Sequence, residues 1–167
     1  MILSTHAVIG AAAASAFPEH PVVAFGVAFA SHFVFDAIPH WHYQVTSSKK
    51  DKQNPMNNDM VMGKQFFADA AKIGFDALLG IGISLIAFSY ILHLPTLLIL
   101  LGAMGAILPD PLQFVYWKFR HEPLISLQRF HIWIHAATDL DDKILLGVGS
   151  QILLIFISIV FVKLALL

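Results

Sequence analysis

The sequence contains no cysteine and only a small share of charged residues. Without cysteine, a disulfide-stabilised scaffold and a thiolate metal site are both excluded. Charged residues make up 13% of the 167 residues, whereas a soluble domain usually carries about 25%. The formal net charge is −1, so the chain has no basic surplus with which to bind a nucleic acid. These shortages exclude a soluble domain, a disordered tail and a DNA- or RNA-binding module.

Apolar residues are abundant instead, at 57% of the chain with a mean hydropathy of +0.73. Long apolar runs predict helices at residues 2–17, 22–38, 66–92, 96–108 and 144–162. A helix needs about 20 apolar residues to cross a ~30 Å hydrocarbon core, and only 66–92 and 144–162 reach that length comfortably. The other three are expected to tilt or to lie partly inside the protein. The sequence therefore predicts one all-α domain, residues 1–167, folded as an integral membrane bundle of about five helices.

Two polar segments separate these runs. Residues 44–65 are rich in Lys, Asn, Ser and Asp and are predicted to form a mobile loop. Residues 110–143 mix aromatic and charged side chains and are expected to include a short amphipathic helix at the membrane interface. Most Lys and Arg residues lie in these two segments, and none lies in the turns at 18–21 and 93–95. The positive-inside rule then predicts a cytoplasmic N-terminus in a multi-pass protein of the inner (plasma) membrane.

Histidine is unusually common, with nine copies against ten Lys plus Arg. Histidines and aspartates from separate segments are predicted to reach one leaflet depth: His6, His32, Asp36, His40, Asp69, Asp76, Asp110, His131 and His135. An ionisable residue inside a membrane segment costs at least ~2.5 kcal/mol, so such residues are retained when they are paired or functional. The convergence of several chain segments, rather than any one residue, indicates a site.

The spacing of these residues is typical of a metal site. His32 and Asp36 are four residues apart and share a helix face, and His131 and His135 repeat that spacing. Imidazole and carboxylate ligands without thiolate suit Zn²⁺, Mn²⁺ or Fe²⁺. We expect a divalent metal, with zinc favoured and one to three ions held. The predicted ligands are His6, His32, Asp36, His40, Asp76, Asp110, His131 and His135.

Each of these patterns also has a structural interpretation. His32 with Asp36 would serve equally as a buried ion pair, and Asp69 with Lys72 as a local pair three residues apart on a helix. Asp110, between two prolines, is compatible with an ordinary turn residue, and His131 and His135 with interfacial side chains. His42 and His121 are expected to be solvated.

The segment Ser31–Asp36, followed by Pro39, is similar to a signature helix of the LexA-regulated membrane-bound metal-dependent hydrolase family. That family also has a histidine near the N-terminus, matched here by Thr5–His6, and a Leu-Pro-Asp turn, matched by Leu108–Asp110. The nearest counterpart of its third, histidine-containing motif is His131–His135, and the order of the motifs is permuted in this chain.

The family is grouped with the zinc-dependent phospholipase C and single-strand nuclease superfamily, whose members are all-helical enzymes with clustered zinc ions. The resemblance therefore implies zinc ligands at His32 and Asp36, with His40 or His42 as the histidine that follows. It also implies a metal-dependent hydrolase.

The residues and the resemblance together predict a membrane-embedded hydrolase that cleaves a phosphate ester of a lipid with a metal-activated water. A membrane lipid, either a phospholipid or a polyprenyl phosphate, is the expected partner. Lys72, Arg120 and Arg129 are candidates to hold its phosphate, and Asp69 to protonate the leaving group. Three alternatives stay open: a divalent-cation or proton transporter using the same cluster, a haem protein with His6 and His32 as axial ligands, and a purely structural membrane protein.

Overall fold

Helices account for almost all of the regular structure in the computed structural model, which describes residues 1–167. The helices are α1 (Leu3–Ala14), α2 (Pro21–Asp36), α3 (Lys64–Ser84), α4 (Thr96–Ile107), α5 (Pro109–Lys118), α6 (Leu124–Ile134) and α7 (Ile144–Ala165). Shorter elements are β1 (Ser48–Lys49), the 3-10 turn η1 (Pro55–Asn57), β2 (Asp59–Met60) and the π-helical segment η2 (Leu85–Ile91), which continues α3. The all-α prediction is confirmed, and each of the five predicted helical runs contains a helix.

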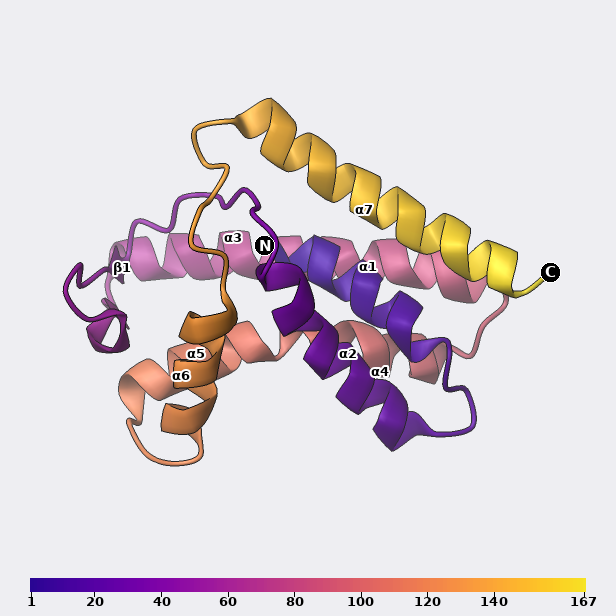
Figure 1. Cartoon of the computed structure of the whole chain (residues 1–167), viewed down its shortest axis with the longest axis horizontal. Coiled ribbons are helices and arrows are strands. Elements are labelled where there is room, and N and C mark those ends of the chain that lie inside the picture. The colour runs from indigo at the N-terminus through magenta and orange to yellow at the C-terminus, as the bar shows by residue number, and fades with distance from the viewer.

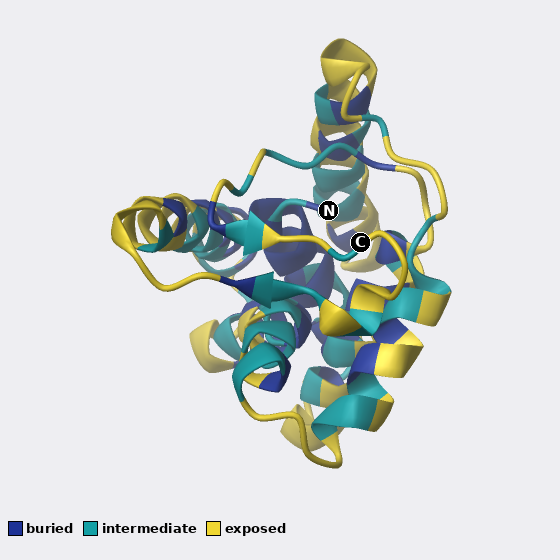
Figure 2. Ribbon diagram, turned by 90° about the vertical axis from the view of Figure 1, so that its left-hand side faces the viewer, coloured by how far each residue is buried: buried dark blue, intermediate teal, exposed yellow.

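Helix α1 lies at the centre of the molecule, in contact with α2, α3, α4 and α7 (Figure 1). Small side chains allow this close packing. A Cβ atom added at Gly10 would lie 2.5 Å from the carbonyl oxygen of Gly102 and would clash with Ala106, so α1 and α4 touch through their backbones. Figure 2 shows the buried residues concentrated in this central region, whereas the outer helix faces are exposed.

Two helices are long and apolar enough to cross a membrane: α3 together with η2, over Lys64–Ile91, and α7. Helices α4 and α5 are bent by 43° relative to each other and would make a third span if they are taken as one broken helix. Helices α1 and α2 are apolar but shorter. Large apolar side chains such as Phe67, Phe75 and Phe161 are exposed on α3 and α7, as expected of surfaces that face lipid.

The segment 110–143 contains two helices where the sequence predicts one. Pro109 was expected to end the preceding helix, but it is the first residue of α5. Proline is favoured at that position because the first backbone N–H of a helix has no partner within the helix. Pro123 in turn is the N-cap residue of α6. These prolines therefore separate and start helices, and so bring Asp110 and His131 onto two adjacent elements.

The polar segment 44–65 also has defined structure. Its strands pair in an antiparallel hairpin, with Ser48 opposite Met60. The hydroxyl of Tyr116 on α5 donates to the carbonyl of Met56 at 3.0 Å, and Lys118 forms an ion pair with Asp59 at 2.6 Å. The hairpin is thus attached to α5 through polar contacts.

Candidate metal centre

Asp36, the last residue of α2, is the point at which two groups of histidines meet. The residue is 2% exposed, and each of its two carboxylate oxygens faces a different group. Oδ2 lies 3.1 Å from His32 Nε2 and 3.2 Å from His131 Nε2. Oδ1 lies 3.6 Å from His40 Nε2 and 3.1 Å from His6 Nε2. A buried carboxylate is costly unless it is paired or holds a cation.

The first ligand group consists of His32, Asp36, Asp110 and His131, each of which offers a ligand atom within 4.8 Å of the others. His32 Nε2 lies 3.4 Å from His131 Nε2 and 3.7 Å from Asp110 Oδ1. Three of the four residues are buried, and Asp110 is 34% exposed at its side chain. Two imidazoles and two carboxylates suit a divalent cation such as Zn²⁺, Mn²⁺ or Fe²⁺.

The second ligand group consists of His40, His42 and His135, whose ligand atoms also lie within 4.8 Å of one another. His40 and His42 follow α2, and His135 is the C-cap residue of α6. The Nε2 atoms of His40 and His42 are 2.8 Å apart, and the rings of His42 and His135 are stacked with centroids 5.5 Å apart. Three imidazoles with one open position are a ligand set used by catalytic zinc.

Three of the histidines have an oxygen partner at the other ring nitrogen. His32 Nδ1 lies 2.8 Å from the carbonyl of Ala106, and His40 Nδ1 lies 2.6 Å from that of Ile38. Because a carbonyl oxygen only accepts, Nδ1 carries a proton, and in the neutral ring Nε2 then presents a lone pair. The same argument applies to His135, whose Nδ1 donates to the carbonyl of Ala136 at 3.2 Å. This outer layer of hydrogen bonds fixes the ring orientation that a metal ligand needs.

His42 receives the corresponding support from a carboxylate. Asp141 Oδ1 lies 3.2 Å from His42 Nδ1 and also accepts from the backbone N–H of His42 at 2.8 Å. With His40 and His42 both protonated at Nδ1, their Nε2 lone pairs point at one another. Such a pair of lone pairs repels unless a proton, another donor or a cation lies between them.

A positive group lies at the junction between the two ligand groups. The α-amino group of Met1 donates to Asp36 Oδ1 at 2.8 Å and also contacts His40 Nε2. His6, from the first turn of α1, lies beside it and stacks on His32 with ring centroids 4.0 Å apart. The Nδ1 atom of His6 is buried and has no hydrogen-bond partner. The donor set therefore accepts positive charge, which fits a metal ion, whereas the predicted ligand His6 belongs to neither ligand group.

Burial tunes the second group towards the neutral, ligand-competent form. It lowers the pKa of His40 to about 3, with a further contribution from the positive charge of the Met1 amine. Burial likewise lowers the pKa of His42 and of His135 below the ordinary histidine value. A neutral imidazole binds metal and an imidazolium does not.

Both groups open onto a single cavity of about 1160 Å³. Asp110, His131, His42 and His135 are among the residues that line it. Most of the other lining residues are apolar, and they come from α3, α5, α6 and the segment after α2. A mainly apolar cavity with a few convergent polar groups is the usual form of a small-molecule site.

Asp76, a predicted ligand, lies outside both groups. Its Oδ2 accepts from the backbone N–H of Leu3 at 2.7 Å, and its Oδ1 from that of Ser4 at 3.3 Å. These N–H groups belong to the first turn of α1, where the helix has no side-chain cap of its own. Asp76 therefore stabilises the start of α1. These contacts give Asp76 a helix-capping role, and its role as a metal ligand stays a prediction.

Asp69 and Lys72 also have a structural role in place of the predicted catalytic one. Asp69 accepts from the backbone N–H and hydroxyl of Ser47, at 2.7 and 2.8 Å, and from Thr46 at 3.1 Å. Lys72 donates to Asp69 at 3.2 Å and to the carbonyl of Gln44 at 2.7 Å. Neither residue lines the cavity. The pair thus attaches the segment 44–47 to α3.

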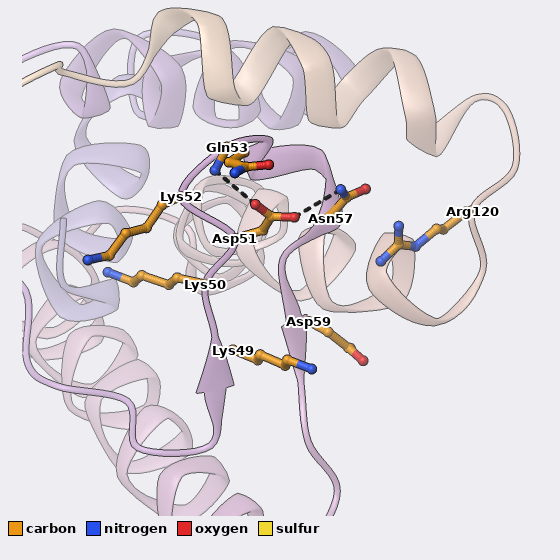
Figure 3. A pocket seen from close by; sticks show the side chains of 8 residues that line it. All are labelled: Lys49, Lys50, Asp51, Lys52, Gln53, Asn57, Asp59 and Arg120. Atoms are coloured by element: carbon orange, nitrogen blue, oxygen red, sulfur yellow. Dashed lines mark hydrogen bonds between the residues drawn. The ribbon is translucent and has the colours of Figure 1, made fainter.

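The predicted phosphate-binding arginines lie away from the cavity too. Arg129 is exposed on α6 and forms no ion pair, so its predicted catalytic role has no geometric support. Arg120 lies at a separate polar hollow of about 540 Å³ beside the hairpin, which Figure 3 shows together with Lys49, Lys50 and Lys52. None of the histidines of the two ligand groups lines this hollow.

One residue of the site was predicted only in part from the sequence, and another was missed. His42 was expected to be solvated, and only the family resemblance offered it as an alternative to His40, yet it is partly buried in the second group. Asp141 was not singled out at all. The closely spaced His40 and His42 were the available signal for the first, whereas nothing in the sequence links Asp141 to a residue 99 positions earlier.

Comparisons of the chain with protein-family models, with curated proteins and with solved structures find no match. The site therefore rests on the geometry itself, which defines a helical protein with buried His/Asp groups that could hold a metal ion.

Proposed function

We propose that this chain is an integral membrane metal-dependent hydrolase that cleaves a phosphate ester of a lipid. The observation that carries the proposal is the shared cavity. Metal-ligand candidates of both groups, Asp110 and His131 from one and His42 and His135 from the other, line it. The remaining wall includes a face of α3, a helix long and apolar enough to span a membrane.

The donor chemistry supports hydrolysis. When bound at these residues, a divalent cation supplies Lewis acidity for a phosphoryl oxygen and a water of lowered pKa. Asp36 faces both groups and orients their imidazoles through the contacts described above. The carbonyls of Ala106 and Ile38 keep His32 and His40 in the tautomer that presents Nε2.

Asp110 is the member of the first group with the largest exposure, 34% at its side chain. It also lines the cavity. A carboxylate at this position orients a water for attack by accepting its hydrogen bond.

The alternative of a haem protein with His6 and His32 as axial ligands has less support. A haem held by His6 and His32 needs the porphyrin plane between the two rings. The two imidazoles are stacked with centroids 4.0 Å apart, which leaves no space for that plane.

The test is hydrolysis by purified, metal-loaded protein in detergent, with a panel of phospholipids and polyprenyl phosphates. We expect release of phosphate or of a phosphorylated headgroup from at least one lipid. His32→Ala and His131→Ala should lose at least ~100-fold in rate, the scale of removing one charge-stabilising group. Arg129→Gln, which changes an exposed residue of α6, is the matched control and should retain the rate.

Two results would overturn the proposal. One is the absence of any release from the whole panel by wild-type protein with bound metal. The other is unchanged hydrolysis in both histidine variants. Flux of the bound cation in proteoliposomes without hydrolysis would support transport instead.

A further inference from the structure

One face of α3 forms the apolar wall of the cavity. The residues that line it are Phe66, Ala70, Ile73, Gly74 and Ala77. Their spacing of three and four residues places them in one stripe along the helix. Phe67, Phe75 and Leu78, which fall outside this stripe, are exposed on the same helix. The same stretch of α3 therefore faces the cavity on one side and presents apolar side chains to the exterior on another.

The length of this stripe matches one leaflet of a bilayer. Phe66 and Ala77 are 11 positions apart, which corresponds to about 16 Å at 1.5 Å per residue. Half of a ~30 Å hydrocarbon core is about 15 Å. The lining also includes His42, Asp110, His131 and His135, so the cavity combines ligands for a charged head with an apolar wall.

We infer that this face of α3 binds the hydrocarbon chain of a lipid phosphate whose head group lies at the metal centre. The inference rests on the proposed function and deepens it. It assigns the substrates to lipid phosphates that carry a hydrocarbon chain, and it excludes water-soluble phosphate esters as preferred substrates. A hydrocarbon chain packs against this apolar wall, and a water-soluble phosphate ester has no chain to make that contact.

Gly74 determines how much room the chain has. A Cβ atom added at Gly74 would meet nothing within 4 Å, so a larger side chain there would project into free space without a clash with the protein. Since Gly74 lines the cavity, that space is where the chain would lie. Gly82, two turns further along α3, also has nothing within 4 Å but does not line the cavity. The two glycines form a matched pair.

The experiment measures binding directly and does not depend on turnover. Native mass spectrometry of the full chain in detergent would count bound oleoyl lysophosphatidate, with glycerol 3-phosphate as the probe that has the same head and no chain. We expect saturable one-to-one binding to wild type and at least tenfold weaker binding to Gly74→Phe. Gly82→Phe should bind like wild type, and glycerol 3-phosphate should bind at least tenfold more weakly than the lipid.

A second variant and the melting temperatures distinguish a blocked chain site from a misfolded protein. Ala70→Phe places the same bulk one turn earlier in the stripe and should also weaken binding, with the melting temperature of each variant measured alongside. Wild-type-like lipid binding by both Gly74→Phe and Ala70→Phe would overturn the inference, as would equal binding of glycerol 3-phosphate and the lipid. These results are separable from the hydrolase test: lipid binding without hydrolysis overturns only the proposed function, and hydrolysis with lipid binding unaffected by both variants overturns only the α3 chain site.

Discussion

Asp36 lies one helical turn after His32 on α2, with its Oδ2 atom 3.1 Å from His32 Nε2, and this contact is the start of the first ligand group. The other carboxylate oxygen faces His40, four residues further on. A single buried carboxylate thus connects two groups of imidazoles. Some of the surrounding residues hold this arrangement in place, and others would hold metal.

Asp141 is expected to tune metal binding by the second group. Because it accepts from His42 Nδ1, its removal should weaken metal affinity by about 10- to 100-fold, the usual effect of losing such a partner. Metal titration of Asp141→Ala followed by calorimetry checks this. Asp142→Ala is the control, since Asp142 is adjacent and makes no contact with the histidines. Equal affinities of the two variants would contradict the assignment.

The second group should bind metal well into mildly acidic solution. An ordinary histidine, with a pKa of about 6.5, loses ligand capacity as the pH falls below that value. Burial lowers the pKa of His40 to about 3 and shifts those of His42 and His135 in the same direction. Protons therefore compete with metal only at lower pH. Metal occupancy should stay constant between about pH 7.5 and pH 6, and a steep fall in that interval would argue against the prediction.

Asp76 should matter for stability and not for metal content. Asp76→Leu would leave the N–H groups of Leu3 and Ser4 without an acceptor, at a cost of about 1–3 kcal/mol each for a buried group. We expect a lower melting temperature in detergent and an unchanged metal stoichiometry. Loss of metal with an unchanged melting temperature would restore the original prediction that Asp76 is a ligand.

The close packing of α1 on α4 leaves no room for one added methyl group at Gly10. Gly10→Ala would force the new Cβ against Gly102 and Ala106, with an expected overpacking cost of about 1–3 kcal/mol. Because the Ala106 carbonyl also holds His32, the metal affinity should fall as well. Gly26→Ala on α2 has open space around its Cβ and should be neutral or slightly stabilising. Thermal unfolding of both variants, together with metal titration, decides this.

The sequence alone predicted the helices and part of the site. Apolar runs predicted the five principal helical segments because burial or lipid exposure of a helix needs such runs whatever the tertiary fold. His32 and Asp36 could be paired because their spacing within one helix determines their shared face. Their grouping with Asp110 and His131 agrees with the predicted convergence of separate segments.

The parts of the site that the sequence left open have a common physical origin. Asp76 and Asp69 are carboxylates in a helix, and spacing alone does not distinguish a metal ligand from a partner of backbone N–H groups on another segment. His42 and Asp141 lie outside helices, 99 positions apart. Their proximity arises from backbone hydrogen bonds that join the segment 136–140 to the end of α2, one from the Ala136 N–H to the Asp36 carbonyl and one from the Leu140 N–H to the His40 carbonyl. No local pattern encodes these contacts.

The most direct test of the account is metal content, measured by mass spectrometry on protein purified in detergent without a chelating resin. Wild type should carry at least one zinc, manganese or iron ion per chain. His32→Ala and His131→Ala should lose metal from the first group, whereas His121→Ala, at an exposed position, should retain it. A wild-type protein without metal after incubation with each ion, or histidine variants that keep the full complement, would contradict the central claim.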